Sequence, residues 1–367
     1  MVRWRGGRVT RLRRAWPGAV ELEVVLDNGE TAPALAYPPL VGQPEPGDRV
    51  LLNVGALLMG LGTGGYALVV AIPDRLPPDP PQAGRTRDEG HLVKARYTPL
   101  QPIRLGADEE ASPHHAVLAE ADSLEGMPVV TADLHSALPA IIAGIHANAP
   151  AARIAYVMTD GGALPAWFSR TLAGLRAVLA GTITVGQAFG GDLEATNVHS
   201  GLLAARHALA ADIAVVAQGP GNLGTGSRWG FSGVAVGEAV NAAAVLGGQP
   251  VGSLRISDAD PRSRHRGLSH HSATAYGRVA LCAADLVVPH GLAPPLAAQV
   301  EQALAELAGR HRIVHVAVDG LDAALRATPV PLSTMGRSLD DDHAYFLAAA
   351  AAGRHAASLL TRPVTPK

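Results

Sequence analysis

The sequence predicts an α/β protein in which a mostly parallel, doubly wound sheet follows a small N-terminal β-barrel. Three observations indicate this fold class. Short β-type segments with turn signals fill residues 1–75, a Pro-rich stretch interrupts the pattern at residues 76–90, and apolar strands alternate with helical segments over residues 91–367. A chain of 367 residues is longer than one small core usually holds. We therefore expect a barrel domain at 1–75, a linker at 76–90 and an α/β domain at 91–367 that carries the site.

The barrel is predicted by five short segments, GRVTRLRR, AVELEVVLD, TAPALAYPPL, DRVLLN and YALVVAIP. Between two of them, Asp27, Asn28 and Gly29 form a hairpin signal, because Asn and Gly tolerate a positive φ. Short strands separated by regular turn signals are typical of a small barrel. Such barrels can bind oligonucleotides, but few aromatic side chains occur here. We expect a structural domain that helps the protein to oligomerise or covers the main site.

Beyond the linker LPPDPPQAGRTRDEG, whose prolines and charges oppose regular structure, strands and helices alternate. MPVVTADL precedes the helical SALPAIIAGIHA, and ARIAYVMTD precedes the helical ALPAWFSRTLAGLRAVLA. TITVGQAF is followed by the helix HSGLLAARHALA, and DIAVVAQG leads to a helix over about residues 233–246. VGSLRIS, DLVVPH and HRIVHVAVD are further strands, and a terminal helix closes the chain. This alternation predicts a mostly parallel sheet covered on both faces.

The composition argues against several classes of partner. Thirty Lys and Arg residues against 32 Asp and Glu residues leave a formal charge of -2, so no global basic field would recruit nucleic acid. The single cysteine, Cys282, excludes an intrachain disulfide and a Cys-rich metal site. The basic N-terminus lacks the apolar region of a signal peptide, and no long apolar run has the character of a membrane span. We expect a cytoplasmic protein without a nucleic-acid or membrane partner.

Polar residues collect where the predicted strands of the second domain end. In open α/β sheets, ligands bind at the carboxyl ends of the strands, near a topological switch point. The loops that follow the strands should therefore share one rim. The clusters at strand ends are Asp133 with His135, Asp160 with Gly161, residues 187–197, residues 218–226, residues 257–271, and His290.

The strongest motif is QGPGNLGTGSRWGFSG, which follows an apolar strand and precedes a helix. Its first glycines satisfy G-x-G-x-x-G, and glycine lets backbone N–H groups approach an anion closely. A dinucleotide site is disfavoured, because the motif does not open the helix directly and lacks the acidic residue at the usual distance. A glycine-rich structural turn is the alternative. The residues expected to bind an anion here are Gly219, Gly221, Gly224, Thr225, Gly226, Ser227 and Arg228.

The second motif is SRHRGLSHHS, which leads into a segment that can be helical from about Ser269, a credible N-cap. The adjacent His270 and His271 would point about 100° apart on a helix and would not easily ligate one metal together. The two arginines favour an anionic ligand over a cation. A polar helix start without a site is the alternative. We expect Arg264, Arg266 and His271 to bind the anion, and His265 or His270 to transfer a proton if there is catalysis.

A metal centre is a separate possibility. Asp133 and His135 follow one strand and Asp160 follows another, and carboxylate plus imidazole from several strand ends is how hydrolase metal centres are assembled. This hypothesis requires the three side chains to converge within a few ångströms. The alternative is that an Asp at a strand end caps the helix that follows, as Asp160 could.

Three consecutive acids, Asp340, Asp341 and Asp342, resemble a magnesium cluster. Ser338 can instead cap a helix there, with Asp341 as its capping-box partner and the acids complementing the helix dipole. We favour the capping interpretation.

Three runs, GPGNLGTG, GFSGVAVGEAVNA and ISDADPRSRHRGLSHHS, are similar to an uncharacterised bacterial family catalogued as a domain of unknown function. The resemblance covers most of the chain. It supplies no activity, so the functional hypotheses rest on the chemistry of the residues. It implies that the family signature includes Gly219, Gly221, Gly224, Thr225, Gly226, His265, Arg266, Gly267, Ser269, His270 and His271.

The first hypothesis is that the protein binds a small anionic ligand, phosphorylated or nucleotide-like, at the strand-end rim. The second is a metal-dependent hydrolase that uses the strand-end acids and His135. The third is a non-catalytic oligomeric scaffold, because the small-residue helix GVAVGEAVNAAAVLGG could pack closely within the chain or across a homodimer. The sequence specifies no cofactor.

Overall fold

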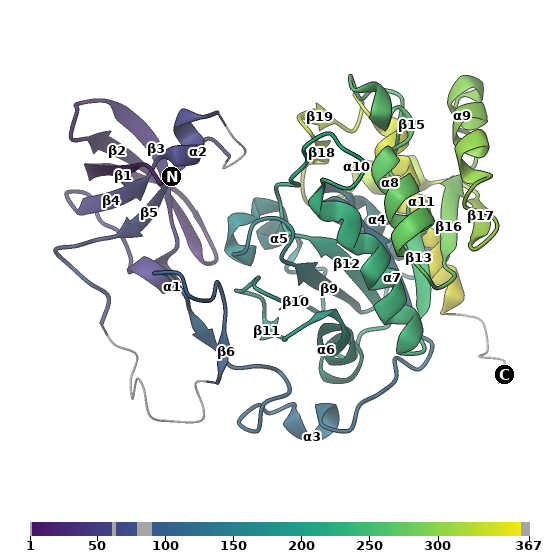
Figure 1. Ribbon diagram of the computed structural model, residues 1–367, viewed down its shortest axis with the longest axis horizontal. Helices are drawn as coiled ribbons and strands as arrows, with labels where there is room; N and C mark the ends of the chain where they lie inside the picture. Colours follow the sequence, from purple (N-terminus) through teal and green to yellow (C-terminus); the bar gives the residue numbers. More distant parts are fainter. Residues whose placement is uncertain (1, 61–63, 79–89, 361–367) are drawn as a thin grey trace. The chain divides into compact units, whose positions relative to one another are not determined.

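The computed structural model describes residues 2–60, 64–78 and 90–360 and divides into two compact units (Figure 1). The first unit comprises Met1–Arg104 with Trp167–Ala173, and the second comprises Leu105–Ala166 with Gly174–Lys367. The first unit extends past residue 75, where the sequence pattern changes, and includes a segment from the middle of the chain. Residues 79–89 of the expected linker lie outside the described residues.

The first unit contains a closed five-stranded barrel with strand order β1-β2-β3-β5-β4, so the predicted barrel is confirmed. Inward side chains such as Leu22, Val24 and Leu52 are fully buried, and they alternate with more exposed neighbours because successive residues of a strand face opposite sides. Gly29, at a φ of 87°, lies in the predicted β2–β3 turn. The elements are β1 (Trp4–Trp16), β2 (Ala19–Leu26), β3 (Thr31–Ala36), α1 (Pro38–Val41), β4 (Arg49–Asn53), α2 (Gly55–Leu58) and β5 (Ala67–Ala71).

The predicted helix over residues 163–180 is wrong for much of its length. A short 3-10 turn (Ala166–Phe168) and α5 (Arg170–Leu175) replace it. Trp167 and Phe168 pack instead against a small cluster of the first unit around Leu35 and Tyr37. The indole N–H of Trp16 donates to the Trp167 carbonyl at 2.6 Å. Burial of these large rings outweighs the local helical preference. The hairpin β6 (Leu92–Val93) and β7 (Ile103–Arg104) belongs to the same unit.

The second unit is built on an eight-stranded, all-parallel sheet of order β11-β10-β9-β12-β8-β13-β16-β17, so the predicted α/β fold is confirmed. Every residue of β8 and β12 is buried, as their continuous apolar runs predicted. The strands are β8 (Pro128–Ala132), β9 (Ile154–Thr159), β10 (Gly181–Thr184), β11 (Leu193–Glu194), β12 (Ile213–Gln218), β13 (Gln249–Ser253), β16 (Asp285–Pro289) and β17 (Arg312–Val316).

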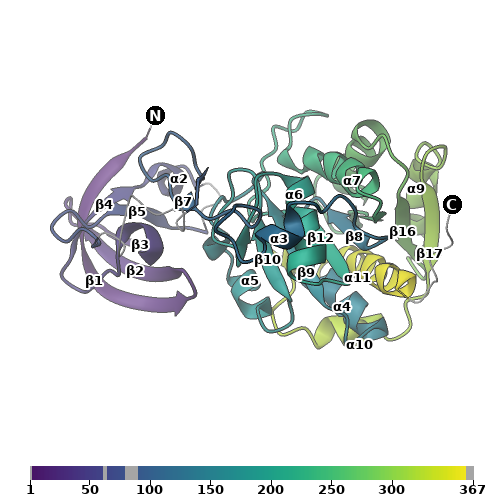
Figure 2. The same cartoon turned by 90° about the horizontal axis from the view of Figure 1, so that it is seen from below.

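Helices cover both faces of this sheet (Figure 2). One face carries α4 (Leu138–Asn148), α10 (Leu321–Arg326) and α11 (His343–Leu359), and the opposite face carries α6 (Val198–Leu203) and α7 (Val236–Val245). The helix α9 (Pro294–Leu304) shares a core cluster with β16. None of the helices in the described residues is long and apolar enough to cross a membrane.

The small-residue helix α7 packs closely within its own chain. A Cβ on Gly237 would lie 2.6 Å from the carbonyl oxygen of Ala275, so only glycine allows this approach. The close-packing face expected from the sequence is therefore occupied by the chain itself.

The chain reverses direction across the sheet at two neighbouring strands. After β8 it crosses to β9, β10 and β11 on one side, and after β12 it passes to β13, β16 and β17 on the other. The connections that leave these adjacent strands therefore diverge, which opens a crevice at their carboxyl ends. Two small hairpins and one short helix follow in the chain near this edge. They are β14 (Ile256–Ser257) with β15 (Gly267–Leu268), α8 (His270–Thr274), and β18 (Ser333–Thr334) with β19 (Arg337–Ser338).

Candidate functional site

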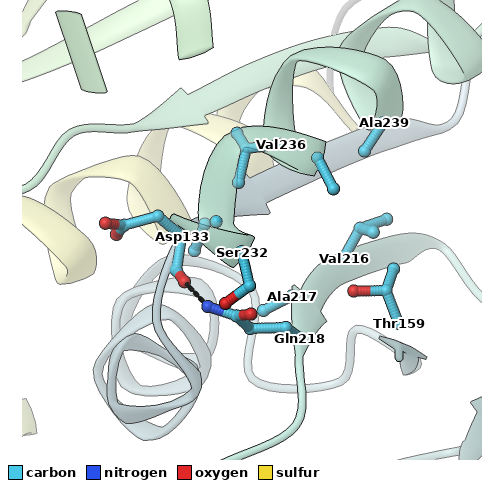
Figure 3. Close-up of a pocket in the computed structure, with 11 residues that line it drawn as sticks. Asp133, Thr159, Val216, Ala217, Gln218, Ser232, Val236 and Ala239 are labelled. Carbon is cyan, nitrogen blue, oxygen red and sulfur yellow. Dashed lines mark hydrogen bonds between the residues drawn. The ribbon is translucent and has the colours of Figure 1, made fainter. Parts of the chain in front are cut away.

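A pocket lies at this switch point, lined by the carboxyl ends of β8, β9 and β12 and by the start of α7 (Figure 3). Its polar lining residues include Asp133, Thr159, Gln218 and Ser232, and Val236 contributes to the apolar wall. The Gln218 side-chain amide donates to the Asp133 carbonyl at 2.7 Å, while the Asp133 carboxylate points away from it. This hydrogen bond links the loop after β8 to the loop after β12, and the chain leaves these two strands in opposite directions across the sheet.

The Asp133 carboxylate faces two cationic or ionisable side chains. Its Oδ2 atom lies 3.4 Å from Nδ1 of His271 and 3.8 Å from a terminal nitrogen of Arg255. Burial alone would raise the pKa of Asp133, but His271 and Arg255 outweigh it, so the pKa is lowered and the carboxylate stays ionised.

His265, His270 and His271 form a cluster, in which one nitrogen from each ring lies within 4.8 Å of the others. We expected His270 and His271 to diverge on a helix, but their ring centroids are 4.4 Å apart. The hairpin that contains Gly267, at a φ of 70°, returns His265 to the start of α8, where its ring lies 5.0 Å from that of His270. The reversal of the backbone in this hairpin and the side-chain conformations of His270 and His271 therefore bring the three rings together, although the two helical residues are about 100° apart around α8.

Neighbouring side chains hold the three rings in place. Ser269 is the N-cap of α8, as predicted, and accepts from the His271 amide at 3.2 Å. Its hydroxyl also lies 2.7 Å from Nδ1 of His265. The His271 ring stacks on Phe231, with centroids 3.8 Å apart and planes 4° apart. Phe231 therefore connects the end of the glycine-rich run to the histidine-rich run.

The electrostatics of the cluster favour the neutral form of two rings, those of His265 and His270. Burial, reinforced by Arg255 and Arg262, lowers the pKa of His265 to about 3. Burial, with contributions from His271 and Arg264, lowers the pKa of His270 to about 4. Two ring nitrogens, Nε2 of His270 and Nδ1 of His271, are buried without a hydrogen bond in the described part of the chain. An uncharged imidazole with an unsatisfied buried nitrogen, such as that of His270, can serve as a ligand.

A buried ionic network supports this segment. Asp260 is fully buried and contacts Arg255 at 3.1 Å, Arg262 at 2.8 Å and Arg337 at 3.1 Å. Although burial opposes ionisation, the bonds from Arg262 and the charge of Arg255 lower the pKa of Asp260. Nothing in the local sequence pattern marks Arg255, Asp260 and Arg337 as neighbours of one another.

The acids before the terminal helix divide between two roles. Ser338 and Asp341 bond to each other, with the Ser338 amide donating to Asp341 at 2.9 Å, but α11 begins at His343 rather than after Ser338. Asp342 instead enters the buried network, where it contacts Ser257 at 2.9 Å and Arg337 at 2.9 Å. Burial raises the pKa of Asp342 despite these bonds. The predicted Ser338–Asp341 hydrogen bonds are therefore present, but the prediction that Ser338 caps the helix is wrong, because α11 begins at His343.

The glycine loop projects from the pocket. Residues 223–229 are exposed, and the loop closes on itself through a bond from the Thr225 amide to the Gly230 carbonyl at 2.7 Å. Thr225 and Ser227 hydroxyls lie 3.1 Å apart. Only the ends of the loop, at Gln218 and at Ser232 with Gly233, are among the residues that line the pocket.

The amides of Gly221, Gly224 and Gly226 donate no hydrogen bond within the described residues. The Arg264 guanidinium lies 3.9 Å from the position that a Cβ on Gly226 would take. The tip of the glycine loop and the arginine of the histidine-rich run are therefore neighbours. Arg228 and Arg266 are also exposed, and Arg266 donates to the Asp260 carbonyl at 3.0 Å.

The three strand-end residues considered for a metal have separate partners. Asp160 accepts from the Gln187 amide at 2.8 Å, and Nδ1 of His135 lies 3.0 Å from the Tyr156 hydroxyl. Burial lowers the pKa of His135 to about 4. Within the described ranges, one group of three possible metal ligands lies close together, and it consists of the three histidines of the cluster. Asp133, His135 and Asp160 do not form such a group there.

Comparison with known proteins gives one match. A family model described as a protein of unknown function, DUF3866, matches residues 33–353, which include the barrel from β3 onward and nearly all of the second unit. No curated protein and no solved structure matches the chain.

Proposed function

Because the chain belongs to DUF3866, a family of proteins of unknown function, we propose its function from the site alone: it binds a small anionic ligand, phosphorylated or nucleotide-like, between Arg264 and the glycine loop. The observation that carries this proposal is the position of Arg264. Its side chain is exposed, lies beside Gly226, and forms no ion pair within the described residues.

Two neighbouring arginines, Arg255 and Arg262, do not share this property. Arg255 and Arg262 both contact Asp260, at 3.1 Å and 2.8 Å, so each already has a carboxylate partner. Arg264 also depresses the pKa of His270, which places its charge near the histidine cluster. An unpaired guanidinium at the carboxyl edge of a parallel sheet is a suitable partner for a carboxylate or a phosphate.

The loop supplies uncharged donors beside this charge. Gly221 and Gly226 have φ values of 92° and 84°, in the left-handed region that glycine adopts at low cost. Their amides, with that of Gly224, are open to a ligand, and backbone N–H groups in such loops bind anions. The hydroxyls of Thr225 and Ser227 are exposed next to them.

If the bound ligand reacts, His270 is the more accessible of the two histidines expected to transfer a proton. His265 is only 1% exposed and its Nδ1 atom faces Ser269, whereas His270 is half-buried. A proton-transfer role is therefore assigned to His270 rather than to His265.

The test is calorimetric titration of the full chain with inorganic phosphate, after dialysis against a chelator. Replacing Arg264 by Ala should weaken phosphate binding about tenfold or more, because a hydrogen bond to a charged group contributes roughly 1.5–3 kcal/mol. Arg264→Lys should retain part of the affinity. Arg278→Ala is the matched control, since Arg278 is also exposed and lacks an ion pair among the described residues. Equal phosphate affinity in wild type and Arg264→Ala would refute the proposal.

A further inference from the structure

We propose that His265, His270 and His271 bind one divalent transition-metal ion, such as Zn²⁺ or Co²⁺, and leave a coordination position open for water or a ligand. The ion would use none of the groups proposed to hold the anion, which are Arg264 and the glycine loop. It would occupy His270, so the proton-transfer role proposed for that ring applies only to the metal-free protein. Ser269 and Asp133 would contact the Nδ1 atoms of His265 and His271, which do not bind the ion.

The geometry of the donors supports a single ion. One nitrogen from each ring lies within 4.8 Å of the other two. Zinc binds imidazole nitrogen at about 2.0–2.1 Å in tetrahedral geometry, which places ligating nitrogens roughly 3.4 Å apart. Rotation of the side chains by about 1 Å at their tips would close the cluster around the ion.

The second observation is a set of buried, unsatisfied atoms. Nε2 of His270 has no hydrogen-bond partner in the described part of the molecule, and neither has Nδ1 of His271, whose side chain is 6% exposed. A buried polar atom without a partner costs about 1–3 kcal/mol. Coordination of the ion by His270 would give its Nε2 atom a partner. Coordination by Nε2 of His271 would leave Nδ1 of that ring directed at Asp133, 3.4 Å away.

The outer contacts match those of histidine ligands. A ligating imidazole usually gives its second ring N–H to a carboxylate or another acceptor, which fixes the tautomer. Nδ1 of His265 lies 2.7 Å from the Ser269 hydroxyl, and Nδ1 of His271 lies 3.4 Å from Asp133 Oδ2. Both contacts use Nδ1, so Nε2 of each ring carries the lone pair for the metal.

The nature of the donors selects the class of metal. Imidazole nitrogens suit Zn²⁺, Co²⁺, Ni²⁺ and Cu²⁺, whereas Mg²⁺ and Ca²⁺ prefer oxygen ligands. The ionised Asp133 would compensate part of the positive charge of the ion, and two of the arginines near the cluster, Arg255 and Arg262, are each paired with Asp260. Three protein ligands with an open fourth position are typical of catalytic rather than structural zinc sites. Such an ion would activate water or polarise a bound oxygen.

The test is titration of the full-length, chelator-treated protein with Co²⁺ alone, followed by its visible absorption and by calorimetry. We expect one ion per chain and the spectrum of a nitrogen-rich, four- or five-coordinate site. His270→Ala and His271→Ala should each weaken Co²⁺ binding by about 100-fold or more. Asp133→Asn, which keeps the shape but removes the charge, should weaken it by about 10- to 100-fold.

His290→Ala is the control. His290 is exposed, and its ring lies 5.5 Å from that of His315, so this pair tests whether a surface site takes up the ion. The variant should bind Co²⁺ as the wild type does. Circular dichroism of each variant separates loss of the site from loss of the fold. The proposal is overturned if the wild type binds no stoichiometric ion, if folded His270→Ala and His271→Ala bind normally, or if His290→Ala abolishes binding. Since the titration contains no anionic probe, its result does not depend on phosphate binding at Arg264.

Discussion

At the residue scale, the position of Asp260 shows how the site tolerates buried charge. Asp260 is inaccessible to solvent, and Arg255, which it contacts, is 3% exposed. A buried ion pair contributes little net stability, but removing one partner leaves the other charge without compensation. The network therefore stabilises the segment before the histidine cluster only while it is complete.

Replacing Asp260 by Asn should lower the free energy of unfolding by about 3–5 kcal/mol, because Arg255 loses its closest carboxylate. The midpoint of urea unfolding measures this change. Asp322→Asn is the control: Asp322 pairs with Arg326 on the surface of α10, and its loss should leave the midpoint almost unchanged. A similar midpoint for Asp260→Asn and wild type would show that the buried network does not carry the stability assigned to it.

At the scale of elements, one carboxylate links the terminal helix α11, most of whose residues are buried, to two strands of the sheet. Asp285 on β16 lies 2.7 Å from Nε2 of His355 on α11 and accepts from Nε of Arg312 on β17 at 2.6 Å. Burial opposes ionisation of Asp285, but His355 and Arg312 outweigh it and lower its pKa to about 2.

This shift predicts an acid-dependent loss of stability. The pKa of Asp285 is lower in the folded chain than in the unfolded chain, so its contribution is complete above about pH 4 and is lost as the pH falls toward 2. The free energy of unfolding should fall over that window by about 1–2 kcal/mol more in wild type than in Asp285→Asn. Urea unfolding at several pH values measures the difference. Parallel pH profiles for the two proteins would contradict the assignment.

At the scale of the whole molecule, two units have separate cores, and the chain leaves the second unit briefly at Trp167–Ala173 to complete the first. Trp167 packs beside Leu35 and Tyr37 in the first unit, with its ring centroid 6.3 Å from that of Tyr37. The stability of the barrel therefore depends on a segment that follows it far along the chain.

Trp167→Ala should accelerate hydrogen exchange of the amides in β2 and β3, because removing a large packed ring costs the local core up to about 3 kcal/mol. Exchange in the central strands β8 and β12 should change much less. Trp229→Ala is the matched control, since Trp229 is 55% exposed on the glycine loop and should leave barrel exchange unaltered. Equal acceleration in both units would mean that they unfold as one.

Local sequence determined the strands of the barrel and the central strands of the large sheet. Continuous apolar runs predicted β8 and β12, alternation predicted the barrel strands, and Ser269 was identified as a cap, because each of these signals acts over a few neighbouring residues. The same reasoning placed the polar loops at one edge of the sheet. It also identified the two runs that Phe231 and His271 bring together.

Only the tertiary structure decided which of those residues meet. The strand order placed β12 beside β8, a hairpin returned His265 to His270, and Asp133 reached His271 from a distant strand. It also moved Trp167 out of a predicted helix and Asp342 into a buried network. These outcomes depend on non-local packing and on the pairing of buried charges, whose energies exceed local preferences and leave no pattern in neighbouring residues.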